Sequence, residues 1–358
     1  MTMRRIASLL FLCLCGTHAL AQAPAAATPA DAAPVIHLPL PWKVGQVLRY
    51  AYENTDDKQS PGKRNRTRVT SVTELRTRRA DKDGFEVHWA SHDTAYRTLE
   101  GDVALDALMA PAMARMEQIP MEVVLEADGA YRSIRNIDQL SARMRVAMAP
   151  VAKASLEAGL QAAPPPQAGS AEERRAQAEA VLKTYLDNIT SPKLLEATAT
   201  RQVRNIAFFN AGGLEDDAWY TLETELPNPT GGANFPAKLE YGLWVSEDDP
   251  EDVYIRWTST IDPVKGAAAL ADTVRRLFGE GLPLAPEDLP KQVAIEDAGL
   301  ILVHRPTGMV EMYEDERTTT FGETKNYERT RMRLLDAGHG HEWADESNVK
   351  SAKDVEAG

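Results

Sequence analysis

Cysteine is nearly absent from this 358-residue sequence, and its two cysteines, Cys13 and Cys15, both lie within the first fifteen residues. Residues 1–21 have the features of a secretory signal: two arginines precede an apolar run at residues 6–15, and a small-x-small cleavage pattern ends at Ala21. Cleavage there would leave a chain without cysteine. We therefore expect the exported protein to have no thiol catalysis, no cysteine-based zinc site and no disulfide bond.

Basic residues are also scarce relative to acidic ones. The sequence has 40 Lys and Arg against 53 Asp and Glu, a formal net charge of -13. Removal of residues 1–21 would take away two arginines and no acid, so 38 basic residues would remain against 53 acidic ones, a charge of -15. This balance excludes nucleic acid as a partner, which requires a basic footprint, and predicts against stable docking on anionic lipid heads.

Long apolar runs are missing as well. The run at residues 6–15 is too short to span a bilayer, and no later stretch is long enough, so we expect no transmembrane span after signal removal. Leu12 and Leu14 precede the two cysteines at the position where a lipobox requires a small residue, which predicts against lipoprotein anchoring. The expected location is therefore the periplasm or the medium.

Motifs for catalysis and cofactor binding are not found either. The sequence has no Gly-x-Ser-x-Gly elbow and no glycine-rich phosphate loop. His88 and His92 would lie roughly 13 Å apart on a strand, too far to share a zinc ion, and His339 and His341 fall in a polar tail. We predict no catalytic residue, no cofactor and no metal site.

What the sequence does have is strand patterning. Alternation and turn residues predict strands at residues 47–54, 64–79, 85–98, 121–127, 130–135, 218–226, 237–247, 252–261, 293–305, 308–317 and 318–335. Helical periodicity predicts helices at about residues 102–118, after Asn136, from the capping box of Ser170 and Glu173, and after Asp262. The predicted fold class is α+β, with curved antiparallel sheets and helices on one face. The order of elements also suggests two diverged β-β-β-α-β-β halves.

The predicted organisation has six parts. They are a signal peptide (1–21), a flexible Ala/Pro-rich tether (22–37), a first β-rich half (38–160), a helical connector (161–207), a second β-rich half (208–335) and a polar disordered tail (336–358).

This outline, with Trp42-x-x-Gly45-Gln46 ahead of long paired strands and lid-like helices, resembles uncharacterised exported proteins of Gram-negative bacteria. It is also loosely similar to the half-barrel carriers that move lipoproteins through the periplasm. The resemblance covers only the rhythm of strands and helices, and it implies no functional residue.

A first candidate ligand contact lies on the predicted hairpin around residues 248–251. Alternation places Glu240 and Trp244 on the same face as Tyr254 and Arg256. An aromatic surface with an arginine suits a planar or anionic group, but an arginine that stacks on Trp244 as ordinary surface cover would produce the same pattern.

Methionines suggest a second contact. Flexible thioethers suit both adaptable apolar binding surfaces and irregular cores, so both roles stay open for Met109, Met113, Met116, Met144 and Met148.

A partner surface is the third candidate. Alternation gathers five arginines on one face of a strand, where they would either meet a partner or keep the strand solvated: Arg64, Arg66, Arg68, Arg76 and Arg78.

We therefore predict a non-enzymatic periplasmic protein that binds an apolar or amphipathic ligand. One alternative is an envelope scaffold whose arginine strand meets an acidic or peptidic partner. A second is a hydrolase without a local signature, in which His88 or His304 would meet a serine and a carboxylate only in the fold.

Overall fold

The computed structural model describes residues 35–101, 103, 106–117, 119–161, 170–196, 201, 203, 206, 213–226, 234–269 and 293–335. The predicted signal (1–21) and the predicted tail (336–358) lie outside these residues. Residues 35–37, at the end of the predicted tether, form strand β1.

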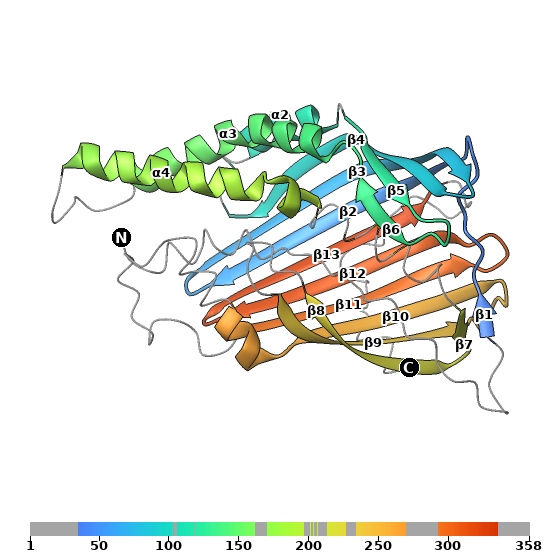
Figure 1. Ribbon diagram of the computed structural model, residues 1–358. Coiled ribbons are helices and arrows are strands. Elements are labelled where there is room, and N and C mark those ends of the chain that lie inside the picture. The colour runs from blue at the N-terminus through green and yellow to red at the C-terminus, as the bar shows by residue number, and fades with distance from the viewer. Residues whose placement is uncertain are drawn as a thin grey trace.

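An open antiparallel sheet of eleven strands dominates the fold (Figure 1). Its order is β6-β5-β4-β3-β2-β13-β12-β11-β10-β9-β8, so every strand lies beside its sequence neighbour except where β2 meets β13. The strands are β2 (Val47–Ser60), β3 (Lys63–Asp81), β4 (Gly84–Glu100), β5 (Met121–Leu125), β6 (Tyr131–Ile134), β8 (Ala218–Leu226), β9 (Phe235–Val245), β10 (Asp252–Ile261), β11 (Val293–His304), β12 (Met309–Phe321) and β13 (Thr324–Leu334). The predicted α+β class with antiparallel sheet is confirmed.

Local turn residues explain where most strands end. Asp128 and Gly129, between the strands predicted at residues 121–127 and 130–135, form the turn that connects β5 to β6, and Gly129 has a φ of +86°, which glycine adopts without strain. One predicted boundary is wrong. The turn between the last two strands lies at Gly322, with φ +55°, and not at residue 317, so β12 continues through the threonine run at residues 318–320.

The pairing of β2 with β13 joins the two ends of the described chain in the middle of the sheet. Its register runs from Lys325 opposite Gln59 to Leu334 opposite Tyr50. Two meanders, β2–β6 and β8–β13, are thereby fused into one sheet. Both halves thus belong to one sheet, and the proposed duplication stays a prediction.

Three helices lie beside the β4 side of the sheet (Figure 1): α2 (Asp106–Met116), α3 (Ile137–Gln161) and α4 (Ala171–Ile189). The predicted capping box is confirmed, since the Ser170 amide donates to Glu173 Oε2 (2.7 Å) and the Glu173 amide donates to Ser170 Oγ (3.1 Å). None of the described helices is long and apolar enough to cross a membrane. A small second sheet pairs β1 (Val35–His37) with β7 (Gly213–Glu215).

The large sheet has two faces of different character. Side chains alternate along each strand, and we call the face that carries Tyr50, Trp257 and Tyr313 the inner face and its opposite the outer face. The main apolar core lies on the inner face, against residues from the N-terminal segment and from the segment after α4, among them Ile36, Leu38, Trp42, Val203 and Ile206. The helices also contact this face, since Thr98 Oγ1 donates to Asp106 Oδ1 (2.6 Å).

Gly299 is required for the packing of this core. Trp257 is 1% exposed, and its indole lies over Gly299, where an added Cβ would be 1.9 Å from Cζ2. We expect Gly299→Ala to lower the free energy of unfolding by about 1–3 kcal/mol, because the ring cannot move without disturbing Tyr313. Denaturant unfolding of the variant and the unmodified chain measures this difference in the free energy of unfolding. Gly266→Ala is the control, since its added Cβ would come closest to the terminal methyl group of Ile261, and an equal loss in both variants would contradict the prediction.

Candidate functional site

The predicted hairpin residues lie together on the outer face of β9 and β10. Trp244 and Tyr254 are directly opposite each other, with stacked rings whose centroids are 5.5 Å apart at an interplanar angle of 17°. Arg256 lies one position further along, opposite Gly242. Glu240 is one position beyond that and accepts a hydrogen bond from Lys238 Nζ at 2.6 Å.

The register extends this group across neighbouring strands. One row runs from Trp219 on β8 through Gly242 and Arg256 to Leu300 on β11. The adjacent row continues from Tyr254 through Leu302 to Met312 on β12. We call Trp219, Trp244, Tyr254, Arg256, Leu300, Leu302 and Met312 the aromatic patch.

Trp219 is the most exposed member of the aromatic patch, at 56%. An added Cβ on Gly242 would lie 2.9 Å from the Trp219 indole, so the ring covers the glycine and turns its other side to solvent. The other members are half-buried. Sequence analysis missed Trp219, Leu300, Leu302 and Met312, because strand pairing rather than sequence distance brings them to Arg256.

The predicted methionines lie near the β4–β6 edge of the sheet, whereas the aromatic patch lies on β8–β12 toward the other edge. Met109, Met116 and Met148 pack around Ala112 and Ala147 where α2 meets α3, and Met144 packs with Ile134 and Leu140. Met113 on α2 is half-buried. The structure therefore places these methionines at helix contacts and does not bring them to the predicted hairpin.

The five predicted arginines do share the outer face of β3, and each contacts a neighbour. Arg64 pairs with Asp57 (2.5 Å), Arg68 with Glu53 (3.7 Å) and Arg76 with Glu74 (2.9 Å). Arg78 Nε lies 3.5 Å from His88 Nδ1. Arg66 lies opposite Asp57 and helps to lower the pKa of that carboxyl group, whose largest stabilising contact is the hydrogen bond from Arg64.

Neighbouring strands enlarge this charged region. We define the basic face by the outer positions that are paired in strands β12, β13 and β2, in β3 as far as Arg76, and in β4 from His88 onward. Arg78, which lies in the β3 bulge just after Arg76, is included with them. Its basic members are Arg49, Arg64, Arg66, Arg68, Arg76, Arg78, Arg97, Lys325, Arg329, Arg331 and Arg333, and its acidic members are Glu53, Asp57, Glu74, Glu100, Glu314 and Glu316.

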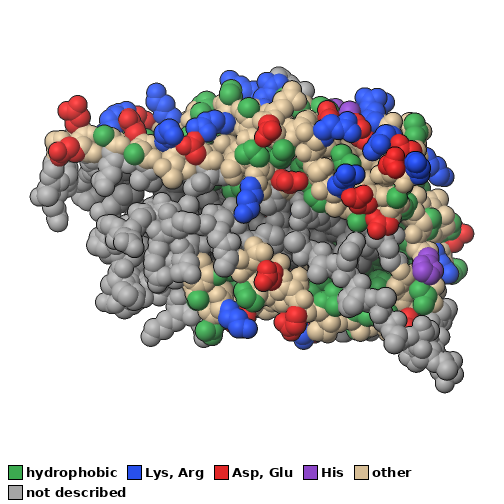
Figure 2. All heavy atoms as spheres, in the orientation of Figure 1, with side chains coloured by type: hydrophobic (Ala, Val, Ile, Leu, Met, Phe, Trp, Pro, Cys, Tyr) green, Lys and Arg blue, Asp and Glu red, His purple; other side chains and the backbone are tan. Residues whose placement is uncertain are grey.

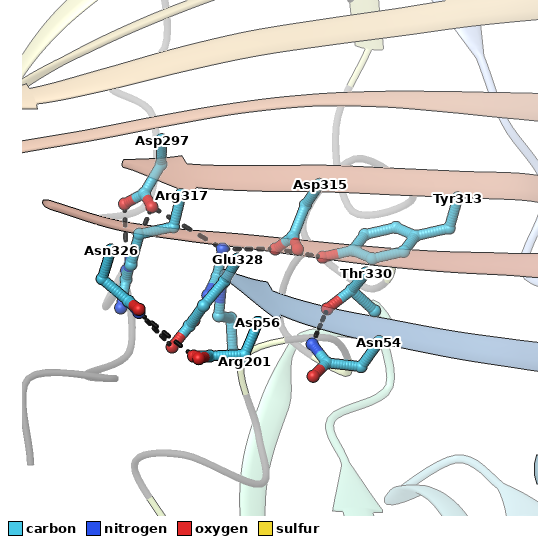
Figure 3. Close-up of polar contacts among 10 residues, drawn as sticks. All are labelled: Asn54, Asp56, Arg201, Asp297, Tyr313, Asp315, Arg317, Asn326, Glu328 and Thr330. Atoms are coloured by element: carbon cyan, nitrogen blue, oxygen red, sulfur yellow. Dashed lines mark hydrogen bonds and ion pairs between the residues drawn. The ribbon is translucent and has the colours of Figure 1, made fainter. Parts of the chain in front are cut away.

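The inner face carries a buried polar network that the sequence did not reveal (Figure 3). Arg317 donates two hydrogen bonds to Asp297, from Nε to Oδ1 (2.6 Å) and from Nη2 to Oδ2 (2.9 Å), and both side chains are 2% exposed. Arg201, after α4, reaches the same region, with its Nη2 2.7 Å from Asp315 and 3.6 Å from Asp297. This network ties the segment after α4 to the sheet.

Asp56 and Glu328 form the edge of this network. They lie opposite each other on β2 and β13, and both accept hydrogen bonds from Asn326 Nδ2, at 3.1 and 3.4 Å. Burial, followed by the charge of Glu328, raises the pKa of Asp56 to about 6. The network is enclosed, so we assign it to stability rather than to ligand binding.

The histidines named for the hydrolase alternative have local partners. His88 Nε2 lies 3.3 Å from Glu86 on the same strand, and His304 contacts Thr307 Oγ1 (2.8 Å) in the following turn and Glu251 (3.5 Å) in the turn between β9 and β10. Neither hydrogen-bonded group includes a serine among the described residues. No cluster of three or more potential metal ligands is found in that part of the chain either. His339 and His341 lie outside it.

The surface of the helices differs from the basic face. Figure 2 shows Lys and Arg interspersed with Asp and Glu along the helices. Arg175 on α4 pairs with Glu157 (2.5 Å) and Glu179 (3.0 Å), and Lys183 pairs with Asp187 (2.8 Å). Opposite charges are therefore balanced there, as is typical of a solvated helix surface.

No family model matches the chain, and no curated protein matches it. Among solved structures, the chain is similar to one described as "lipid-protein interactions in lipovitellin", with 10% sequence identity and a TM-score of 0.39. The similarity covers 85% of this chain but only 27% of that one. The resemblance to uncharacterised exported proteins of Gram-negative bacteria and the looser similarity to periplasmic half-barrel lipoprotein carriers stay predictions.

Proposed function

We propose that this chain is an exported, non-enzymatic protein that binds an apolar or amphipathic ligand at the aromatic patch. Export rests on the signal features of residues 1–21. The binding site rests on one observation: two adjacent rows of the sheet gather the exposed Trp219 and half-buried aromatic and aliphatic side chains around a single arginine on the outer face. Contiguous apolar surface of this kind is typical of binding sites.

The inner face supports ligand binding less well. Its main apolar residues, such as Leu239, Ile255 and Ile301, are at most 1% exposed because the chain itself packs against them. A ligand there would have to displace part of the core. The aromatic patch needs no such rearrangement, since Trp219 already turns half of its surface to solvent.

Arg256 sets the expected chemistry of the ligand. Arg256 lies in the same row as Trp219 and next to the row of Tyr254, where its guanidinium can meet a carboxylate or another anionic head group while the rings and Leu300 cover an apolar chain. We therefore expect an amphipathic anion to bind better than a cation with the same chain.

Calorimetric titration below the micelle concentration tests this proposal, with dodecanoate and dodecyltrimethylammonium as probes. Trp219→Ala is expected to weaken the binding of both probes by roughly tenfold, because each loses the indole contact. Arg256→Gln is expected to weaken only dodecanoate.

Two exposed positions far from the aromatic patch provide matched controls. Val146→Ala on α3 removes apolar surface, and Arg132→Gln on β6 removes a positive charge. Neither should change affinity. If dodecanoate does not bind, or if Trp219→Ala leaves its affinity unchanged, the proposed site is wrong.

A further inference from the structure

The basic face is positive although the chain as a whole is negative. Its paired positions hold ten basic and six acidic side chains, an excess of four positive charges, in a chain whose net charge is -13. Such segregation of charge by sign is a property of surfaces that attract an oppositely charged partner.

Internal ion pairs do not remove this excess, because every acidic member is already engaged by an arginine of the same face. Arg64 lies 2.5 Å from Asp57 and 3.6 Å from Glu100. Glu53 is shared by Arg68 and Arg331. The remaining pairs are Arg76 with Glu74 (2.9 Å) and Arg329 with Glu314 (2.7 Å) and Glu316 (3.7 Å).

Two arginines face each other at the β3–β4 side of this surface. Arg68 and Arg97 are directly opposite, an arrangement that destabilises an isolated strand pair through like-charge repulsion. Arg97 is exposed, as are Arg49, Arg78 and Lys325 on the surrounding strands. An anionic partner that lies across β3 and β4 would relieve this repulsion.

We propose that the basic face docks an extended, acidic segment of a partner protein. Outward side chains on β3 recur every second residue, roughly 6.6 Å apart, and an extended peptide presents alternate side chains at the same repeat. A segment with Asp or Glu at alternate positions can therefore match Arg64, Arg66 and Arg68 one by one along the strand.

The charge of the whole chain favours a local polypeptide segment over an anionic membrane or a nucleic acid. Both of those present wide negative surfaces, which repel the acidic remainder of the protein at long range. A single acidic strand contacts only the basic face and avoids most of that repulsion.

Binding of a synthetic peptide of alternating glutamate and threonine to the full chain tests this inference. We expect binding that weakens steeply as salt is raised. Combining Arg78→Glu with Arg97→Glu should weaken it by roughly tenfold or more, because both side chains are exposed members of the basic face. Circular dichroism verifies that the variant is folded.

The control makes the same two charge reversals elsewhere, at Arg132 on β6 and Arg175 on α4, whose side chains are 57% and 51% exposed. It should retain the peptide affinity of the unmodified chain. The inference is overturned if the peptide does not bind, if both double variants lose affinity equally, or if vesicles of phosphatidylglycerol and phosphatidylcholine bind the face while the peptide fails to compete. Dodecanoate binding at the aromatic patch is read separately, so either proposal can fail alone.

Discussion

Replacing Arg317 by methionine is expected to lower the free energy of unfolding by about 3–5 kcal/mol, as is typical when one partner of a buried ion pair is removed. The guanidinium makes two parallel hydrogen bonds to Asp297, and both side chains are 2% exposed. Methionine fills much of the same volume, so the loss reports the stranded carboxylate rather than a cavity. Arg201, at 3.6 Å from Asp297, is too distant to replace those two bonds.

Chemical denaturation measures this loss, and two further variants identify its cause. Arg175→Met breaks exposed ion pairs that solvent screens, so it should lower the free energy of unfolding far less than Arg317→Met does. Adding Asp297→Asn to Arg317→Met should restore part of the stability, because it removes the buried negative charge. A loss below about 1 kcal/mol for Arg317→Met would show that this pair does not hold the network together.

Local signals explain the part of the fold that could be predicted from sequence. The Asp128-Gly129 turn, the capping box of Ser170 and Glu173, and the Asp262 side chain that accepts from the amides of Val264 and Lys265 all act within a few residues. Alternation then gives each strand its two faces. It correctly placed Trp244, Tyr254 and Arg256 on one surface, because a single hairpin connects them.

Pairings between distant segments could not be predicted in the same way. The β2–β13 pairing connects Tyr50 with Leu334, and no local residue pattern specifies that register. The buried network depends on it, since Asp56 meets Glu328 only through that pairing. Trp219 was missed for a similar reason: its place beside Arg256 depends on two successive strand pairings.

The two faces of the sheet therefore have different roles: the inner face packs the fold together, and the outer face carries the proposed binding surfaces. The inner face is covered by the N-terminal segment, the helices and the segment after α4, and its polar residues hold these parts in place. The outer face carries both proposed binding surfaces, which meet where Met312 lies opposite Arg333. A ligand on one surface and a partner on the other would thus be neighbours.

Replacing Asp56 by asparagine is expected to stabilise the protein at neutral pH, with a gain that disappears in acid. Burial and the charge of Glu328 raise the pKa of Asp56 to about 6, above the value of about 3.9 typical of an unfolded chain. The folded state therefore holds this proton more tightly. Its contribution to stability is fully present below about pH 4 and is lost as pH rises through about 6, a difference of about 3 kcal/mol. The substituted amide would carry no charge, and its oxygen can still accept the hydrogen bond from Asn326.

Asp57, the next residue along β2, provides a control with the opposite sign. It lies on the outer face, where the hydrogen bond from Arg64 holds its pKa below the usual range. Its stabilising contribution is therefore present above about pH 4 and is lost as pH falls, so Asp57→Asn should destabilise the protein at neutral pH and less so in acid. Denaturant unfolding from about pH 4 to 8 measures both variants against the unmodified chain. Differences that run in opposite directions are the expected result, whereas parallel curves would mean that the pKa of Asp56 is not raised in the folded protein.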